Sequence, residues 1–180
     1  MTTALITGAS GGIGEELARQ ARKAGHDVVL VARSGARLQK LADELGTAST
    51  IVVVADLSTA EGIAAVTAAV PVVDILVNNA GYGDFGPFVE SGPTRVRNMV
   101  QQNVAALTDL TRHYLPAMVE GGNGRILNVA STAAFFPGPT MSVYYATKAF
   151  VLSFSEGIAE ELRGSGVTVT ALCPGRPGTS

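Results

Sequence analysis

The chain has 180 residues with a formal net charge of −2, and 47% of its residues are hydrophobic and 16% charged. This composition is typical of a globular protein, excludes a disordered chain, and gives no electrostatic basis for binding nucleic acid or an anionic membrane. A single cysteine, Cys173, excludes an intrachain disulfide and argues against a metal cluster, so we assign no residue to a metal. The N-terminus lacks the basic start of a signal peptide, and no apolar run reaches the ~20 residues of a membrane-spanning helix. We therefore expect a cytoplasmic protein.

Short apolar runs rich in Val and Ile alternate with segments of helical periodicity along the whole chain. We interpret these runs as parallel strands that are covered on both faces of a sheet. The pattern predicts an α/β fold with a doubly wound, mostly parallel, Rossmann-like sheet of about six strands and helices on both faces. Because the alternation does not break, we assign residues 1–180 to a single domain. The predicted strands are residues 4–6, 27–32, 50–55, 72–77, 125–129 and 167–172.

Three helical segments are predicted from the positions of their apolar residues. The first begins near Ile13 and ends at Gly25, and the second covers residues 36–45. The third carries a stripe of apolar residues at helical spacing, and one amide side chain, Asn103, interrupts it. A buried amide without partners costs about 1–3 kcal/mol, so Asn103 should bond to backbone or water, and a structural and a functional role are equally open. Pro116 should kink or end this helix. The stripe comprises Val96, Val100, Asn103, Leu107, Leu110, Tyr114 and Met118.

A glycine-rich segment, residues 7–14, follows the first predicted strand and leads into a helix. A helix N-terminus presents unpaired N–H groups and the positive end of its dipole, and glycines let a pyrophosphate approach the backbone. This segment is therefore predicted to bind the phosphates of a dinucleotide. Its spacing differs from G-x-G-x-x-G, and an ordinary glycine-rich turn is the alternative. The residues predicted to bind are Gly8, Ser10, Gly11, Gly12, Ile13 and Gly14.

The end of the second predicted strand indicates which dinucleotide binds. NAD-binding folds usually place Asp or Glu there, where the carboxylate bonds the 2′-hydroxyl of the ribose. Here the strand ends in Ala32-Arg33-Ser34, and Arg37 follows one helical turn later. A planar guanidinium with several donors suits a 2′-phosphate. We therefore expect NADP(H) to be favoured over NAD(H), and a solvated surface arginine is the alternative.

Tyr144 and Lys148 are four residues apart, which places both side chains on one face of a helix. Free tyrosine has a pKa near ~10, too high for a good base at neutral pH, and a nearby ammonium favours the phenolate. Tyr144 is therefore predicted to exchange a proton with a carbonyl or alcohol oxygen, which the hydroxyl of Ser131 would hold. We interpret Tyr145 as packing. Because Y-x-x-x-K also occurs by chance, a packed Tyr144 beside a solvated Lys148 is the alternative.

Taken together, these segments resemble the short-chain dehydrogenase/reductase family as far as Pro174-Gly175. In that family a T-G-x-x-x-G-x-G segment binds the cofactor diphosphate, and residues 7–14 match it. The resemblance also implies that Asp56-Leu57 contacts adenine and that the Asn78–Gly81 segment lies beside the adenosine ribose. The implied cofactor-binding residues outside the glycine segment are Arg33, Asp56, Leu57, Asn79, Ala80, Gly81, Tyr144, Lys148, Pro174 and Gly175.

The same resemblance implies four catalytic residues. Tyr144 would be the acid and base, and Ser131 would orient the substrate oxygen. Lys148 would favour the phenolate and hold the nicotinamide ribose. Asn103 would keep a water that links Lys148 to solvent as a proton relay. The cofactor carries the hydride chemistry and the protein positions it.

Relatives continue beyond Pro174-Gly175 into a substrate lid, a further helix and a seventh strand, whereas this sequence reads Arg176 to Ser180 and stops. We therefore expect a C-terminally truncated member that lacks the final strand and the lid. The leading interpretation is an NADP(H)-dependent oxidoreductase acting on a small-molecule carbonyl or alcohol, and the alternative is a non-enzymatic or poorly active dinucleotide-binding remnant. Residues 83–88 and 135–141 are expected to line an apolar pocket. The resemblance also implies a homodimer through the helices of Asn103 and Tyr144.

Overall fold

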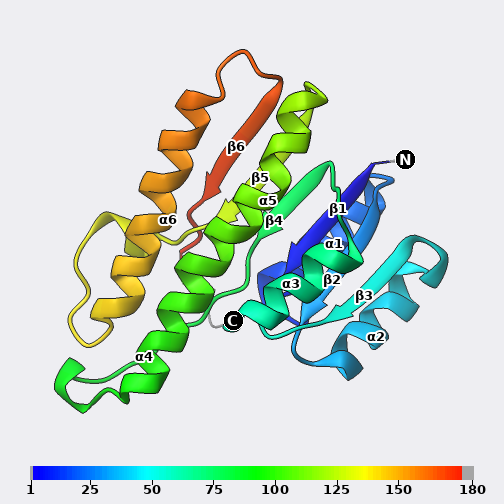
Figure 1. Cartoon of the computed structure of the whole chain (residues 1–180). Coiled ribbons are helices and arrows are strands. Elements are labelled where there is room, and N and C mark those ends of the chain that lie inside the picture. Colours follow the sequence, from blue (N-terminus) through cyan, green and yellow to red (C-terminus); the bar gives the residue numbers. More distant parts are fainter. Residues whose placement is uncertain (1, 176–180) are drawn as a thin grey trace.

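The computed structural model describes residues 2–175 (Figure 1). Within them, a parallel six-stranded sheet has the order β3-β2-β1-β4-β5-β6, which confirms the predicted fold class. Two of the predicted strands, residues 27–32 and 167–172, have the predicted bounds. The strands are β1 (Thr3–Thr7), β2 (Asp27–Ala32), β3 (Thr50–Val54), β4 (Ile75–Asn78), β5 (Gly124–Val129) and β6 (Val167–Leu172).

Helices cover both faces of the sheet, as predicted. In Figure 1, α3, α5 and α6 lie on the near side, while α1 and α2 pack on the other. Within residues 2–175 no helix combines the length and the apolar content needed to cross a bilayer. The α-helices are α1 (Gly12–Lys23), α2 (Gly35–Leu45), α3 (Ala60–Ala69), α4 (Pro93–Val100), α5 (Ala106–Glu120) and α6 (Ser142–Glu161). Shorter turns are η1 (Thr47–Ser49), η2 (Phe88–Glu90), η3 (Gln101–Ala105) and η4 (Thr132–Phe135).

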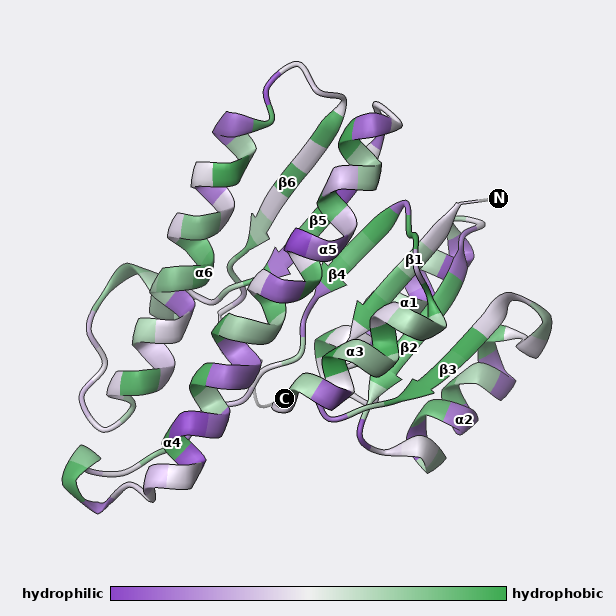
Figure 2. Cartoon of the chain, viewed as in Figure 1, coloured by the Kyte–Doolittle hydropathy of each residue, from purple (hydrophilic) through white to green (hydrophobic). Residues whose placement is uncertain are grey.

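The core divides into two main layers because the sheet separates them. Alternate residues of the central strands point to opposite faces, so Leu5 packs toward α3 and α5 while Ala4 and Ile6 pack toward α1 and α2. The most hydrophobic residues concentrate in the strands, and polar residues lie on the outward faces of the helices (Figure 2). Both layers support the central strands β1 and β2, whose ends carry the predicted phosphate loop and Arg33.

Three strand predictions need correction. β4 begins at Ile75, not at Val72, which is 62% exposed and precedes the sheet. β3 and β6 are not covered on both faces. The exposed positions are Ile51 and Val54 in β3 and Thr168, Thr170 and Leu172 in β6. The physical reason is position: among the described strands β3 pairs only with β2 and β6 only with β5, so both lie at edges of the sheet.

The predicted long helix is divided by η3, a π-helical segment between α4 and α5. A π-helical turn accommodates an extra residue, so the buried face N-terminal to it shifts by one position. For this reason Met99 is buried, whereas Val100, predicted on the buried stripe, is 41% exposed. The prediction that Pro116 ends the helix is wrong: α5 continues past it to Glu120.

Phe150 and Phe154 stack on α6 with ring centroids 5.7 Å apart. Phe150 is exposed and Phe154 is partly buried. The pairing of two copies through this helix and its neighbour stays a prediction.

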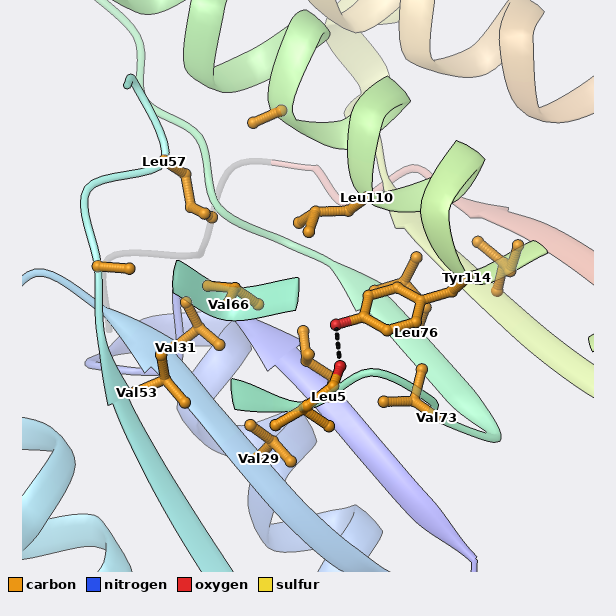
Figure 3. Packing of buried hydrophobic residues seen from close by; sticks show 14 of the residues in the cluster. Leu5, Val29, Val31, Val53, Leu57, Val66, Val73, Leu76, Leu110 and Tyr114 are labelled. Carbon is orange, nitrogen blue, oxygen red and sulfur yellow. Dashed lines mark hydrogen bonds between the residues drawn. The ribbon is translucent and has the colours of Figure 1, made fainter. Parts of the chain in front are cut away.

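Tyr114 supplies one measurable contribution to the layer beneath α5. Its buried hydroxyl donates to the carbonyl oxygen of Val70 at 2.8 Å, across to the end of α3 (Figure 3). We expect Tyr114→Phe to lower the free energy of unfolding by about 1–2 kcal/mol, because the carbonyl loses its buried donor. Thr50→Val is the control: it removes a solvent-exposed hydrogen bond from the Thr50 hydroxyl to the carbonyl of Gly46. It should change the free energy of unfolding by less than about 0.5 kcal/mol. Urea denaturation of both variants checks this, and equal effects would contradict it.

Candidate functional site

A cleft of about 830 Å³ opens at the carboxyl ends of the strands. It lies where the strand order reverses between β1 and β4, the position at which open α/β sheets bind ligands. The structure brings most of the predicted nucleotide-binding and catalytic residues together around this one cleft. The predicted residues that line it are Gly8, Ser10, Gly11, Ile13, Arg33, Leu57, Asn79, Ala80, Gly81, Ser131, Tyr144, Lys148, Pro174 and Gly175.

Four predicted residues are not among those that line the cleft: Gly12, Gly14, Asp56 and Asn103. Gly14 has a packing role instead. A Cβ on Gly14 would collide with the carbonyl oxygen of Gly8 and the side-chain amide of Asn79. Only a glycine therefore lets the first turn of α1 approach the ends of β1 and β4 this closely.

The ends of β1 and β4 are joined through the side chain of Thr7. Its buried hydroxyl donates to the carbonyl of Val77 at 3.2 Å and accepts from the N–H groups of Asn79 and Ala80, both at 2.9 Å. In return, the amide of Asn79 donates to the carbonyls of Thr7 at 2.9 Å and Gly8 at 3.2 Å. These bonds hold the glycine loop and the segment after β4 in one arrangement on either side of the reversal.

Asp56 is engaged locally. Its Oδ1 accepts from the backbone N–H of Ser58 at 2.9 Å and from the Ser58 hydroxyl at 2.7 Å. These hydrogen bonds, aided by the charge of Arg33, hold the pKa of the Asp56 carboxyl below its usual value. The carboxylate thus stabilises the turn before α3, and the adjacent Leu57 lines the cleft.

Arg33 and Arg37 both line the cleft at the end of β2 and the start of α2. No salt bridge joins either guanidinium to a carboxylate of residues 2–175. Ser34, which was not predicted, lies between them in the same lining. This end of the cleft is therefore basic, and its guanidinium donors are available to an anionic ligand.

Lys148 is buried and not solvated, which excludes the alternative interpretation for its side chain. Its ammonium donates to the carbonyl of Val129 at 2.8 Å and lies 5.7 Å from the ring centroid of Tyr144. Burial lowers the pKa of Lys148 from 10.5 to about 8, a shift that the nearby Cys173 opposes. At pH 7 the group is therefore still mainly charged, at the side of the phenol ring.

Ser131 caps the N-terminus of η4 and lies two residues after the end of β5. Its hydroxyl oxygen accepts from the N–H of Ala133 at 3.1 Å, which fixes the side chain at the edge of the cleft. Since this bond uses an oxygen lone pair, the hydroxyl hydrogen remains available to donate. Ser131 and Tyr144 both line the cleft.

A chain of buried polar groups attaches α6 to the sheet. The amide of Asn78 on β4 donates to Asn128 on β5 at 2.9 Å, and the amide of Asn128 donates to the Ser155 hydroxyl on α6 at 2.9 Å. Apolar surfaces pack without a unique register, whereas hydrogen bonds between buried groups form in one register only. This chain therefore positions the helix that carries Tyr144 and Lys148.

Asn103 connects three segments from within η3. Its side-chain amide donates to the Tyr82 carbonyl at 2.9 Å and to the Thr147 hydroxyl at 3.1 Å, while its Oδ1 accepts from the Tyr82 N–H at 3.1 Å. The buried amide was predicted to bond to backbone or water, and its partners are the backbone of Tyr82 and the hydroxyl of Thr147. The side chain holds the loop after β4 against α6, and the water relay stays a prediction.

The cleft also includes residues that sequence reasoning did not assign to the site. The rule that ligands gather at the carboxyl ends of strands could have found Val31, Ala55 and Ala130. Tyr82 and Gln102 carried no such signal, because their placement depends on the bonds of Asn103 and on η3. The residues missed are Val31, Ala32, Ser34, Ala55, Tyr82, Gln102, Val129, Ala130, Thr132, Ala133 and Tyr145.

The sequence matches the short chain dehydrogenase family over residues 2–180. It is similar to an NADP-dependent 3-hydroxy acid dehydrogenase of Escherichia coli strain K12, at 38% identity over 97% of this chain and 72% of the relative. It is also similar to an uncharacterized oxidoreductase of Bacillus subtilis strain 168, at 36% identity over 96% of this chain and 67% of the relative.

Solved structures are similar over the same region. A short-chain dehydrogenase from Sphingobium yanoikuyae in complex with NADPH superposes with a TM-score of 0.91 at 40% identity, covering 97% of this chain and 71% of that one. A bulky-bulky ketone specific alcohol dehydrogenase from Comamonas testosteroni superposes with a TM-score of 0.93 at 37% identity, covering 100% of this chain and 76% of that one.

The buried amine of Lys148 makes stability depend on pH. Its folded-state pKa of about 8 lies below the ordinary 10.5, so between these pH values the unfolded chain binds more protons than the folded chain. The free energy of unfolding should therefore rise with pH in this window, relative to Lys148→Met, by about 2–3 kcal/mol in total. Urea denaturation of both proteins from pH 7.5 to 10 checks this, and a difference that does not change with pH would contradict it.

Proposed function

Since the chain belongs to the short-chain dehydrogenase family, we propose that it is an NADP(H)-dependent oxidoreductase. It would transfer a hydride between the nicotinamide and the carbonyl or alcohol group of a small molecule. The observation that carries this proposal is the single cleft that Ser131, Tyr144 and Lys148 share with the glycine loop and Arg33.

The residues of the cleft fit a dinucleotide with a 2′-phosphate. A Cβ on Gly11 would meet no atom within 4 Å, so the glycine loop faces open space at the N-terminus of α1. Arg33 and Arg37 supply the guanidinium donors that a phosphate requires. The relative from Escherichia coli is NADP-dependent and the structure from Sphingobium yanoikuyae holds NADPH, which supports the same choice of cofactor here. The bound cofactor would supply the hydride in reduction and accept it in oxidation.

The chain's own residues would move the proton. In reduction, the hydroxyl of Tyr144 donates its proton to the carbonyl oxygen, and in oxidation the phenolate takes it back. The hydroxyl of Ser131 donates a hydrogen bond to the same oxygen and so holds the substrate in place. The ammonium of Lys148 stabilises the phenolate, and its bond to Val129 leaves two N–H donors for ribose hydroxyls. Asn103 acts as a positioning residue through Tyr82 and Thr147.

We propose that the substrate carries apolar substituents beside its carbonyl group. Of the two segments expected to line an apolar pocket, residues 83–88 and 135–141, only Met141 lines the cleft, while Phe85, Phe88, Phe135 and Phe136 are exposed outside its lining. The relatives named above include a 3-hydroxy acid dehydrogenase and a bulky-bulky ketone specific alcohol dehydrogenase. A panel of ketones with two bulky substituents, simple aldehydes and 3-oxo acids, each tested with NADPH, separates these substrate classes.

Cofactor preference tests the role of Arg33. We expect NADPH to bind at least several-fold more tightly than NADH, because only the 2′-phosphate pairs with the guanidinium. Arg33→Asp should abolish or reverse this preference, since a carboxylate repels the phosphate and accepts from a 2′-hydroxyl. Arg112→Asp, an exposed change on α5, is the control with equal change in charge and should retain the preference. Thermal-shift titration of the three proteins with NADPH and with NADH measures all six affinities, and equal affinities in the unmodified chain would contradict the assignment.

Turnover tests the role of Tyr144. We expect Tyr144→Phe to lower kcat for carbonyl reduction by about 10²-fold or more, while the Kd for NADPH stays within about twofold, because the phenol acts on the substrate oxygen. Tyr114→Phe removes a phenol oxygen outside the cleft and should retain kcat. NADPH consumption followed by absorbance provides the measurement. Full activity in Tyr144→Phe would show that another group supplies the proton.

A further inference from the structure

The ring of Tyr144 lies against the backbone of Gly83, a residue without a side chain in the loop after β4. A Cβ on Gly83 would lie 3.1 Å from Cδ2 and 3.2 Å from Cγ of Tyr144, and 3.0 Å from the terminal methyl of Met141. These distances are shorter than ordinary van der Waals contact. The φ of Gly83 lies outside the left-handed region that favours glycine, so its backbone conformation is open to other residues. The ring, and not the turn, therefore requires a glycine here.

The backbone around Gly83 is held on both sides. Asn103 bonds both the N–H and the carbonyl of Tyr82, and Arg95 pairs with Asp84 at 2.7 Å. The Tyr82 hydroxyl also donates to the carbonyl of Arg95 at 3.1 Å. A side chain added at Gly83 would therefore displace the ring of Tyr144 or the end of Met141 more readily than the loop.

Tyr145 borders the same ring from another direction. The two rings meet edge to face, with centroids 6.1 Å apart and an interplanar angle of 75°. Tyr145 itself packs on Gly138, where a Cβ would collide with its ring, and on Phe136 at 5.8 Å. The Tyr144 ring thus lies between the loop after β4 and the ring of Tyr145, which in turn packs on the segment before α6. A backbone hydrogen bond of 2.8 Å from Gly86 to Thr140 joins these two segments.

We propose that Gly83 is a positioning residue for the proton donor: its bare backbone sets where the Tyr144 ring lies in the cleft. This inference rests on the proposed function of Tyr144. A Cβ at residue 83 shifts the ring by a few tenths of an ångström, which misaligns the phenol with the substrate oxygen. Misplacement of a reacting group by about 1 Å can cost about 10²-fold in rate, so a smaller shift should cost about tenfold.

The test compares Gly83→Ala with Gly92→Ala, which lies in the same connection between β4 and α4. A Cβ on Gly92 meets only the Cβ of Arg95, at 3.9 Å, so this control adds a methyl without a close contact. We expect Gly83→Ala to lower kcat about tenfold, with the Kd for NADPH and the melting temperature close to those of Gly92→Ala. Gly92→Ala should retain the kcat of the unmodified chain.

A second readout does not depend on turnover. The chain has four tyrosines, and in protein labelled with ¹³C-tyrosine the ring cross-peak that Tyr144→Phe removes belongs to Tyr144. This cross-peak should move in Gly83→Ala and stay in place in Gly92→Ala.

The outcomes separate the two claims. Absence of Tyr144-dependent turnover in the unmodified chain would overturn the proposed function, while a moved cross-peak would still support the placement of the ring by Gly83. An unmoved Tyr144 cross-peak in Gly83→Ala would overturn the inference, whether or not the chain turns over. If the unmodified chain is active and Gly83→Ala has the same kcat, the inference is likewise overturned.

Discussion

The buried hydroxyl of Thr7 is the interaction on which the rest of the site depends. It joins the ends of β1 and β4, the two strands between which the sheet order reverses, by pairing one carbonyl and two N–H groups there. Without it those N–H groups would lose their partner, at a cost of about 1–3 kcal/mol for each buried group left unpaired. The cleft opens at this junction because the connections after β1 and β4 diverge, and the hydroxyl keeps their first residues in register.

The position of α6 is the second constraint. Its apolar face could pack on β5 in neighbouring registers, but the bond from Asn128 to Ser155 and the bond from Lys148 to Val129 form in only one of them. The Val129 carbonyl also offsets part of the cost of burying the lysine, which keeps its charge near neutral pH. Two neighbouring residues of β5 thus position α6: Asn128 bonds to Ser155, and Val129 accepts from the ammonium of Lys148.

The two ends of the cleft use different means to meet different needs. At the end of the cleft with the glycine loop and Arg33, backbone N–H groups and guanidinium side chains face open space, which suits a ligand with several negative oxygens. At the Tyr144 end, side chains are in close contact with backbone at Gly83 and with each other, which suits a reaction that requires exact placement of one proton. Both ends are supported by the same junction, since the segment after β4 runs from Asn79 through Gly83.

Local patterns were enough to predict the fold class and most of the residues that gather around the candidate cleft. The strand at residues 27–32, the glycine loop at residues 7–14, Arg33 and the four-residue step from Tyr144 to Lys148 each depend on neighbouring residues, so the sequence displays them directly. Periodicity could not reveal η3, because the side chain within it, Asn103, bonds to residues 21 and 44 positions away.

The interpretation of Val100 as buried failed for that reason: the π-helical turn changes which side chain faces the core. The burial of Lys148 and the contact of Gly83 with Tyr144 likewise arise between segments distant in the sequence. Spacing along the chain places residues on one face of a helix, but it does not specify which other element packs against that face. Those contacts exist only once the strands and helices have assembled, since they depend on the packing between elements and not on the propensities within them.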